Sequence, residues 1–251
     1  MTKYVIKSGE WEKIFPILAA ERVIYAKNEL KTKRFFEAIH YLALEGCRWR
    51  ALPRWYGKWR AVHKRYLEWC KKGIFDMLFA YFSKDFDGEY IMIDSTIVRA
   101  HPFAGGSQRI DGKCSGLGRS KGGFTTKIHA VVDALGLPLR LLLSAGQRHD
   151  IVYAEQLLKG FEGANVIGDK GYDSNKLINA LQEQKCTIVI PSKRNRKIPR
   201  NIDRHIYKER HLVEIFFRKL KNFRRVFSRF DKEIVAYQGF VTFVSILMWL
   251  K

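Results

Sequence analysis

Hydrophobic residues recur at intervals of three and four through the first eighty or so positions of the chain. This spacing places them on one face of a helix, so it predicts a series of amphipathic α-helices. Gly46 follows the second group, at a position where glycine commonly ends a helix. The groups are Trp11, Ile14, Phe15 and Leu18; Phe35, Ile39 and Leu42; Trp59, Val62, Tyr66 and Trp69; and Phe75, Leu78, Phe79 and Phe82.

From Glu89 onward the pattern changes to short apolar runs typical of β-strands. The runs are EYIMID, KIHAVVDA, LPLRLLLS, ANVIGD and CTIVIP. The second and third flank a turn around Gly136 and Pro138, which predicts a hairpin. Helices are expected at 150–160 and 174–184. The expected fold class is therefore α/β, a mixed sheet flanked by helices and preceded by an all-helical region.

The polar stretch SKDFDGE separates the two patterns and predicts a domain boundary, with one domain at 1–85 and another at 86–251. Residues 102–123 are rich in glycine and cations, which predicts a long loop. A mobile basic loop beside a phosphate substrate and simple disorder both fit this composition. Near the other end, VAYQGFVTFVSILMWL is short for a membrane span and contains polar residues, so we expect a buried closing helix.

The stretch YKERHLVEIFFRKLK, residues 207–221, divides most clearly into a polar and an apolar face. On a helical wheel its polar stripe consists of Tyr207, Arg210, Glu214, Arg218 and Lys221. The sequence thus predicts one helix that buries its apolar face and presents a carboxylate among cations. Taken alone, such a stripe is also typical of a solvated surface.

Charge changes this picture, because 46 lysines and arginines stand against 25 acids and give a formal net charge of +21. This excess predicts a polyanionic partner. Nucleic acid is favoured over a membrane because the cations are spread from end to end. The four cysteines form no CxxC pair, which indicates neither a zinc site nor a disulfide framework. The N-terminus lacks an apolar signal core, so we expect a cytoplasmic, nucleoid-associated protein.

The connector CRWRALPRWYGKWR is basic and aromatic, and helices are predicted on both sides of it. This succession predicts a helix-turn-helix-like module that binds DNA. A plain helical bundle with a basic surface fits the same pattern. The side chains that could reach phosphates or base edges are Arg48, Arg50, Arg54, Lys58 and Arg60.

Three carboxylates are brought together by the predicted order of elements. Asp94 ends the first strand, Asp169 ends the fourth, and Glu214 lies on the helix after the fifth. Three acids at one point need a cation to stay ionised, and oxygen ligands without histidine or cysteine favour Mg²⁺ or Mn²⁺. Two such ions could activate an attacking oxygen and stabilise the leaving oxygen in a phosphodiester displacement.

Three sequence blocks resemble the DDE transposases of bacterial and archaeal insertion sequences, specifically the insertion sequence five group within the insertion sequence four superfamily. The blocks are MIDSTIVRAHPFAGG around Asp94, GDKGYDS around Asp169, and YKERHLVEIFFRKLK around Glu214. The third contains the family's Tyr-x2-Arg-x3-Glu-x6-Lys signature. GCRWRALP and the segment between the first two blocks are also similar, so the resemblance covers nearly the whole chain.

The resemblance implies a ribonuclease H-like catalytic domain whose catalytic and metal-binding acids are Asp94, Asp169 and Glu214, with two Mg²⁺ ions, or Mn²⁺, per active site. It also implies that part of the polar stripe contacts phosphates at the transposon end; these residues are Tyr207, Arg210 and Lys221, with Arg218 beside them. Asp173 is expected to cap the helix that follows it.

The expected function is that of a transposase. It would bind the terminal inverted repeats of its element, cleave DNA at the ends and join the 3′-hydroxyls to target DNA. A homodimer or larger synaptic complex is expected, because two ends must be handled together. Two alternatives stay open. One is an inactive or repurposed transposase that acts as a DNA-binding regulator, and the other is a ribonuclease H-like nuclease that hydrolyses without strand transfer.

Overall fold

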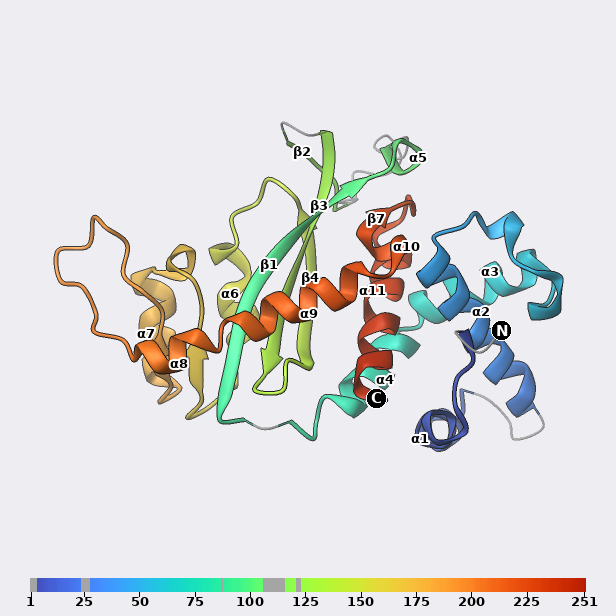
Figure 1. The fold of residues 1–251 in the computed structure, drawn as a ribbon, viewed down its shortest axis with the longest axis horizontal. Coiled ribbons are helices and arrows are strands. Elements are labelled where there is room, and N and C mark those ends of the chain that lie inside the picture. Colours follow the sequence, from blue (N-terminus) through green and yellow to red (C-terminus); the bar gives the residue numbers. More distant parts are fainter. Residues whose placement is uncertain (1–3, 24–27, 87, 106–115, 121–122) are drawn as a thin grey trace. The chain divides into compact units, whose positions relative to one another are not determined.

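The computed structural model describes residues 4–23, 28–86, 88–105, 116–120 and 123–251. Its elements separate into two compact units, coloured along the chain in Figure 1. The helical unit contains Met1–Lys84, His101–Asp111 and Leu220–Lys251, and the sheet unit contains Asp85–Ala100 and Gly112–Lys219. Much of the predicted glycine-rich loop, 106–115 and 121–122, lies outside the described residues. The functional division at residue 85 stays a prediction.

The helical unit is built from the amphipathic helices that the spacing of apolar residues predicted. Gly46 ends the second of them in a left-handed conformation, with φ of 65°, which glycine adopts without steric cost. The elements are α1 (Ser8–Ala20), α2 (Glu29–Glu45), η3 (Trp49–Ala51), η4 (Arg54–Tyr56), α3 (Trp59–Lys71), α4 (Ile74–Phe82), α5 (Pro102–Gly105), α10 (Arg224–Phe227), β7 (Ser228–Arg229) and α11 (Ile234–Trp249).

Helix α11 forms the centre of this unit and is buried along most of its length. The ring of Phe243 lies 5.6 Å from that of Phe36 and 5.8 Å from that of Phe75. The Tyr66 hydroxyl donates a hydrogen bond of 2.6 Å to the carbonyl of Ala236. A helix apolar on all sides must be covered on all sides, and α2, α3 and α4 provide that cover. The expected buried closing helix is confirmed.

Within the described ranges, no helix has both the length and the apolar character needed to cross a membrane.

The sheet unit is a mixed sheet flanked by helices, as predicted. Helix α6 packs against β3 and β4, and α7 packs against β6. The elements are β1 (Tyr90–Ala100), β2 (Gly118–Ser120), β3 (Gly123–Asp133), β4 (Pro138–Ala145), α6 (Ile151–Leu158), β5 (Asn165–Ile167), η5 (Lys170–Tyr172), α7 (Asn175–Glu183), β6 (Thr187–Val189), α8 (Arg204–Lys208) and α9 (His211–Lys221), whose last two residues belong to the helical unit.

Strand β1 lies in the middle of the sheet, between β3 and β5 (Figure 1). It pairs antiparallel with β3 and parallel with β5, which in turn pairs parallel with β6. Strands β3 and β4 form the antiparallel hairpin expected around Gly136. Strand β3 therefore runs opposite to β1, β4, β5 and β6.

Two expected element boundaries were wrong. Strand β1 does not end on Asp94 but continues to Ala100, because the residues after Asp94 keep pairing with β3 as far as Arg99. The predicted single helix 207–221 is divided into α8 and α9. Between them the amides of Arg210 and Leu212 bond carbonyls three residues back, which tightens the backbone in a way that apolar spacing does not reveal.

Replacing Gly239 by alanine is expected to lower the free energy of unfolding by about 1–3 kcal/mol through overpacking. A Cβ atom at this position of α11 would lie 2.3 Å from Cys70 Sγ and 2.8 Å from the Tyr66 hydroxyl oxygen. That clash outweighs the preference of helices for alanine over glycine, about 1 kcal/mol. Urea unfolding followed by circular dichroism measures the change.

The matched control is Gly9→Ala in α1, where an added Cβ meets nothing within 4 Å and stability should be unchanged or higher. If Gly239→Ala were as stable as the parent protein, α11 would not be packed as closely as described.

Candidate active site

Asp94 lies where β1 loses its parallel neighbour. Strand β5 pairs with β1 only at Tyr90–Met92, whereas on the other side Asp94 is paired with Ala130 of β3. The Ser95 amide donates a 2.8 Å hydrogen bond to Asp94 Oδ1. The carboxylate is thus held by the strand's own backbone and is 21% exposed.

Arg210 joins Asp94 to Glu214. Its Nη1 lies 3.1 Å from Asp94 Oδ2, and its Nη2 donates to Glu214 Oε1. In Figure 1, α9 crosses β1. The ion pair between Arg210 and Asp94 shows that the start of this helix lies beside the strand at Asp94. One guanidinium therefore bridges two of the three predicted acids. The sequence assigned Arg210 to DNA phosphates, and it did not reveal that the same side chain would bind the acids.

Asp169 follows β5, and its side chain accepts a 2.8 Å hydrogen bond from the Gly171 amide. The pKa of Asp94 is raised to about 6, mainly by burial and also by the nearby carboxylates of Asp169 and Asp150, against the opposing effects of the Ser95 amide and Arg210. Asp169 is therefore close enough for Asp94 to respond to its charge. The structure links Asp94 to Glu214 through the shared guanidinium of Arg210 and to Asp169 through electrostatics.

The donor chemistry of this cluster fits a divalent cation. Carboxylate oxygens are the ligands that Mg²⁺ and Mn²⁺ prefer. The guanidinium of Arg210 is a stand-in cation, since it occupies a position shared by Asp94 and Glu214. In the part of the chain that is described, no three His, Cys, Asp or Glu side chains are close enough to hold a metal together.

Asp150 is a further acid near this site that the sequence did not single out. Its Oδ1 lies 2.8 Å from Lys127 Nζ and 3.6 Å from His129 Nδ1. His129 is fully buried, bonds Ser144 Oγ at 2.8 Å through Nε2, and has its pKa lowered to about 4 by burial. It is therefore neutral and structural at pH 7. The signal available beforehand was an acid at the first position of the predicted helix 150–160.

Asp173 does not cap α7, contrary to expectation. The cap is Ser174, whose hydroxyl accepts from the Leu177 amide. Asp173 instead binds the guanidinium groups of Arg196 and Arg200. Burial alone would raise the pKa of Asp173, but hydrogen bonds from Arg196, the Lys193 amide and Arg200 hold it well below its usual range. The carboxylate stays ionised because two cations surround it.

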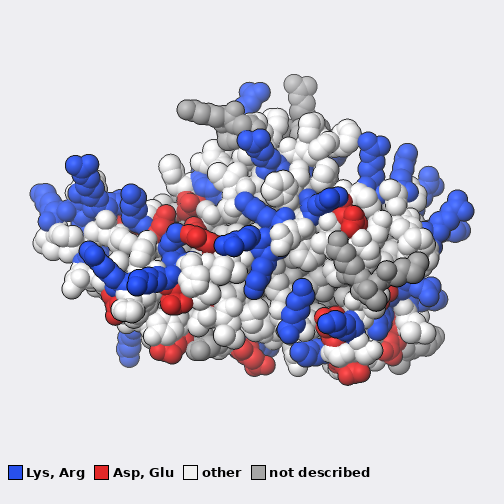
Figure 2. Space-filling view, in the orientation of Figure 1, with Lys and Arg blue, Asp and Glu red and all other residues white. Residues whose placement is uncertain are grey.

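The five cations of the connector that were predicted to bind DNA are accessible. In the helical unit, Arg48, Arg50, Arg54, Lys58 and Arg60 are all exposed. The guanidinium groups of Arg50 and Arg60 lie 5.7 Å and 5.5 Å from the centre of the Trp59 ring. The two cations therefore contact the same indole. Figure 2 shows lysine and arginine side chains across the face in view. Whether these residues contact DNA stays a prediction.

The other predicted DNA contacts lie on α8, α9 and the turn between them. Tyr207 is half-buried on α8, and Arg218 is exposed on α9. Lys221, at the end of α9, is partly buried, and burial lowers its pKa. The break between the helices means that Tyr207 does not share a continuous helical stripe with Glu214 and Lys221.

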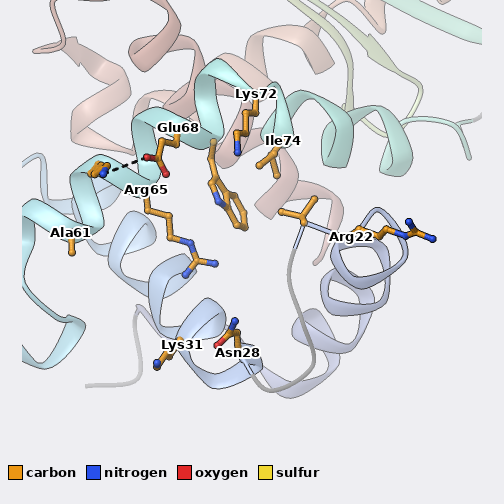
Figure 3. A pocket seen from close by; sticks show the side chains of 11 residues that line it. Arg22, Asn28, Lys31, Ala61, Arg65, Glu68, Lys72 and Ile74 are labelled. Carbon is orange, nitrogen blue, oxygen red and sulfur yellow. Dashed lines mark ion pairs between the residues drawn. The ribbon is translucent and has the colours of Figure 1, made fainter.

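A second group of cations in the helical unit was not predicted. It surrounds a cavity of about 780 Å³ between the helices (Figure 3). The lining contains one acid, Glu68, which pairs with Lys64 at 4.0 Å. Arg65 is held in place by Thr32, at 2.8 Å, and by the rings of Phe35 and Trp69. The cations of the lining are Arg22, Lys31, Lys64, Arg65 and Lys72.

Comparison with protein families identifies the class to which this fold and these acids belong. Residues 85–242 match the family described as "Transposase DDE domain". The chain therefore belongs to the DDE transposases. Residues 6–79 match a second family, described as "Putative transposase of IS4/5 family", which places the chain among the insertion sequence 4/5 transposases. Membership of the DDE family implies dependence on divalent metal.

Individual proteins similar to this chain include one that is named a transposase. The chain is 42% identical over 130 residues to a Brucella ovis protein named "Putative transposase for insertion sequence element IS6501", covering 51% of this chain and all of that protein. It is 36% identical over 107 residues to the uncharacterized protein y4sN of Sinorhizobium fredii, covering 43% of this chain and 86% of that protein.

Among solved structures, a chain of the piggyBac transposase synaptic complex with hairpin DNA aligns with 78% of this chain and half of its own length, at a TM-score of 0.44 and 15% identity.

Removing the guanidinium of Arg210 is expected to raise the pKa of Asp94 above its value of about 6, because Arg210 opposes the effect of burial. The titration of ¹³C-labelled aspartate carboxyls in the Arg210→Gln variant, followed by NMR in metal-free buffer, measures this. Arg218→Gln, which removes an exposed arginine of α9, should leave the Asp94 midpoint unchanged. An Asp94 midpoint that stays the same or falls in Arg210→Gln would contradict the bridge.

Proposed function

We propose that this chain is the transposase of an insertion sequence, which binds the terminal inverted repeats, cleaves DNA at the element ends and joins the 3′-hydroxyls to target DNA. The observation that supports it most directly is the bridge from Arg210 to Asp94 and Glu214, because acids distant in sequence share one cation. The strand order, with β3 running opposite to its neighbours, supports the ribonuclease H-like fold that this chemistry uses.

Asp94, Asp169 and Glu214 are the residues that would hold two Mg²⁺ ions, or Mn²⁺. When bound, such ions supply activation of the attacking oxygen and stabilisation of the leaving oxygen. The Ser95 amide keeps the Asp94 carboxylate oriented. Burial disfavours the ionised form of Asp94, so the ionised carboxylate is more stable when a cation lies beside it.

Arg210 has two roles in this proposal. Without DNA it neutralises Asp94 and Glu214, and with DNA its guanidinium turns to a phosphate of the transposon end. Arginine suits both partners because its planar fork matches carboxylate and phosphate geometry alike. The exchange releases the acids at the moment when substrate arrives. Tyr207, Arg218 and Lys221 are proposed to contact further phosphates of the same end.

The remaining partners follow from the same reaction. Two transposon ends must be held together for strand transfer, so a homodimer or larger synaptic complex is proposed. The working place would be the nucleoid, where target DNA lies.

Asp94→Asn is expected to abolish end cleavage while DNA binding is retained. Loss of a metal ligand removes at least about 3 kcal/mol of transition-state stabilisation, hence a fall of about 100-fold or more. The measurement uses a labelled duplex carrying the element's end, a supercoiled target plasmid, and Mg²⁺ or EDTA. Products are separated into nicked ends and joined plasmid.

Metal-dependent nicking followed by joining supports the transposase, and nicking without joining supports a nuclease that only hydrolyses. Binding by the parent protein with no cleavage in Mg²⁺ or Mn²⁺ favours the DNA-binding regulator. Cleavage by Asp94→Asn at the parental rate would remove Asp94 from the active site.

The connector of the helical unit is proposed to bind the DNA backbone. The double variant Arg50→Gln/Arg60→Gln should weaken binding and reduce the slope of log K against log salt by about 0.9 for each phosphate that is no longer neutralised. Fluorescence anisotropy over a range of salt concentrations measures both quantities. The control is Lys13→Gln/Arg34→Gln, which removes two exposed cations from α1 and α2 of the same unit. Equal effects in the two variants would show that the connector has no special role.

A further inference from the structure

The loop between β6 and α8 is the most basic short segment of the sheet unit. Its residues 192–200, called the loop below, contain five cations and no acid. Neither the proposed catalytic acids nor the predicted DNA contacts lie in it. The cations are Lys193, Arg194, Arg196, Lys197 and Arg200. Five positive charges so close together repel one another and must be stabilised by other contacts. The contacts of the loop therefore indicate its function.

A single buried carboxylate holds the loop in shape. Asp173, whose side chain is 1% exposed, accepts hydrogen bonds from the Lys193 amide at 2.8 Å, from Arg196 Nε and Nη2 at 3.0 and 2.6 Å, and from Arg200 Nη2 at 2.7 Å. Arg200 also donates to the Ile190 carbonyl, and its amide to Ser192 Oγ. Both ends of the loop are therefore tied to the same carboxylate.

This anchor leaves most of the charge available. One carboxylate offsets only one of the five positive charges. Lys193, Arg194 and Lys197 are exposed and make no ion pair within the described part of the chain. Beside them is a cavity of about 480 Å³, lined by the start of α7 and by loop residues that include Lys193, Arg196 and Lys197. The loop therefore presents exposed cations around this cavity, while Asp173 fixes the loop on its buried side.

The chemistry of the loop fits a nucleic-acid backbone better than a single small anion. The three exposed cations are spread along the loop, as a row of phosphates requires. Ile198, at 83% exposed, lies between Lys197 and Pro199. Apolar side chains beside cations are common where proteins contact sugars and the minor groove of DNA.

The anchor also connects the loop to the proposed active site. Asp173 follows Asp169 after the single turn η5, Lys170–Tyr172. The same short segment thus carries a proposed catalytic acid and the residue that grips the loop. A phosphate held by the loop would be fixed relative to Asp169, within one compact unit.

We propose that the loop of residues 192–200 is a DNA-backbone-binding surface of the sheet unit, and that Asp173 is the positioning residue that keeps it in its binding shape. The proposal deepens the proposed function, because it rests on the chain binding DNA. It adds a contact surface distinct from the connector in the helical unit and from the residues of α8 and α9.

The first test removes exposed charge from the loop. Lys193→Gln/Lys197→Gln is expected to weaken binding of a random-sequence duplex by roughly threefold to tenfold and to reduce the salt slope by about 0.9 for each phosphate that the loop no longer neutralises. The control, Lys159→Gln/Lys185→Gln, removes the same charge from exposed positions of the sheet unit outside the loop. Binding is measured by fluorescence anisotropy with EDTA, so that no cleavage occurs. Equal affinities of the two variants would overturn the proposal.

The second test separates the effect of the loop's shape on DNA binding from the effect of its charge. Asp173→Asn makes the protein more positive, so charge alone would strengthen DNA binding. We expect it to weaken binding instead, because Arg196 and Arg200 lose their anchor and the loop loses its shape. Tighter binding by Asp173→Asn, with the parental melting temperature, would overturn the positioning role.

A third measurement needs no variant. Hydrogen–deuterium exchange of the parent protein should show protection of residues 192–200 when the duplex is added. Failure of the parent protein to bind any duplex would remove the proposed function itself. Normal binding without protection of the loop, and without an effect of Lys193→Gln/Lys197→Gln, would remove only the loop from the DNA-binding surface.

Discussion

The candidate site depends on unequal pairing along the two edges of β1. On one edge β3 is paired from Ile91 to Arg99, which fixes the strand firmly. On the other edge β5 is paired only as far as Met92. Asp94 therefore has a rigid backbone and an edge that its parallel neighbour no longer covers. Asp169, which follows β5 as that strand ends, is close enough for Asp94 to respond to its charge.

The acids of the site are unusual because the chain around them is so basic, with a net charge of +21. Asp94 and Asp173, two carboxylates of the sheet unit, are both bound by arginine, but with different outcomes. Asp173 is bound by two guanidinium groups and a backbone amide, and its pKa is depressed. Asp94 has a single arginine that it shares with Glu214, and its pKa stays raised. The first arrangement is a permanent anchor, whereas the second leaves an anion in need of a further cation.

The spacing of apolar residues predicted the elements that bury one face, because residues at helical or strand spacing lie on the same face. The helices of the first eighty residues, the end of α2 at Gly46, the closing helix and the hairpin are of this kind. Sequence motifs predicted the family and the acid triad, whose metal-binding role stays a prediction. Three features depended on contacts between distant segments and were missed: the continuation of β1 beyond Asp94, the tight turn at Arg210, and the grip of Asp173 on a loop some twenty residues away.

The position of α11 has a consequence for folding during synthesis on the ribosome. Tyr66 and its hydrogen-bond partner Ala236 are 170 residues apart in the chain. At a synthesis rate of about 5–20 residues per second, the first helices wait roughly ten to thirty seconds for the helix that fills their core. During that interval Phe36, Phe75 and their neighbours are without α11, while the complete set of sheet strands is made and can pair. Helices α2, α3 and α4 are made long before α11 and are thus among the last elements to become fully folded, and in that interval they are the part most exposed to chaperones and proteases.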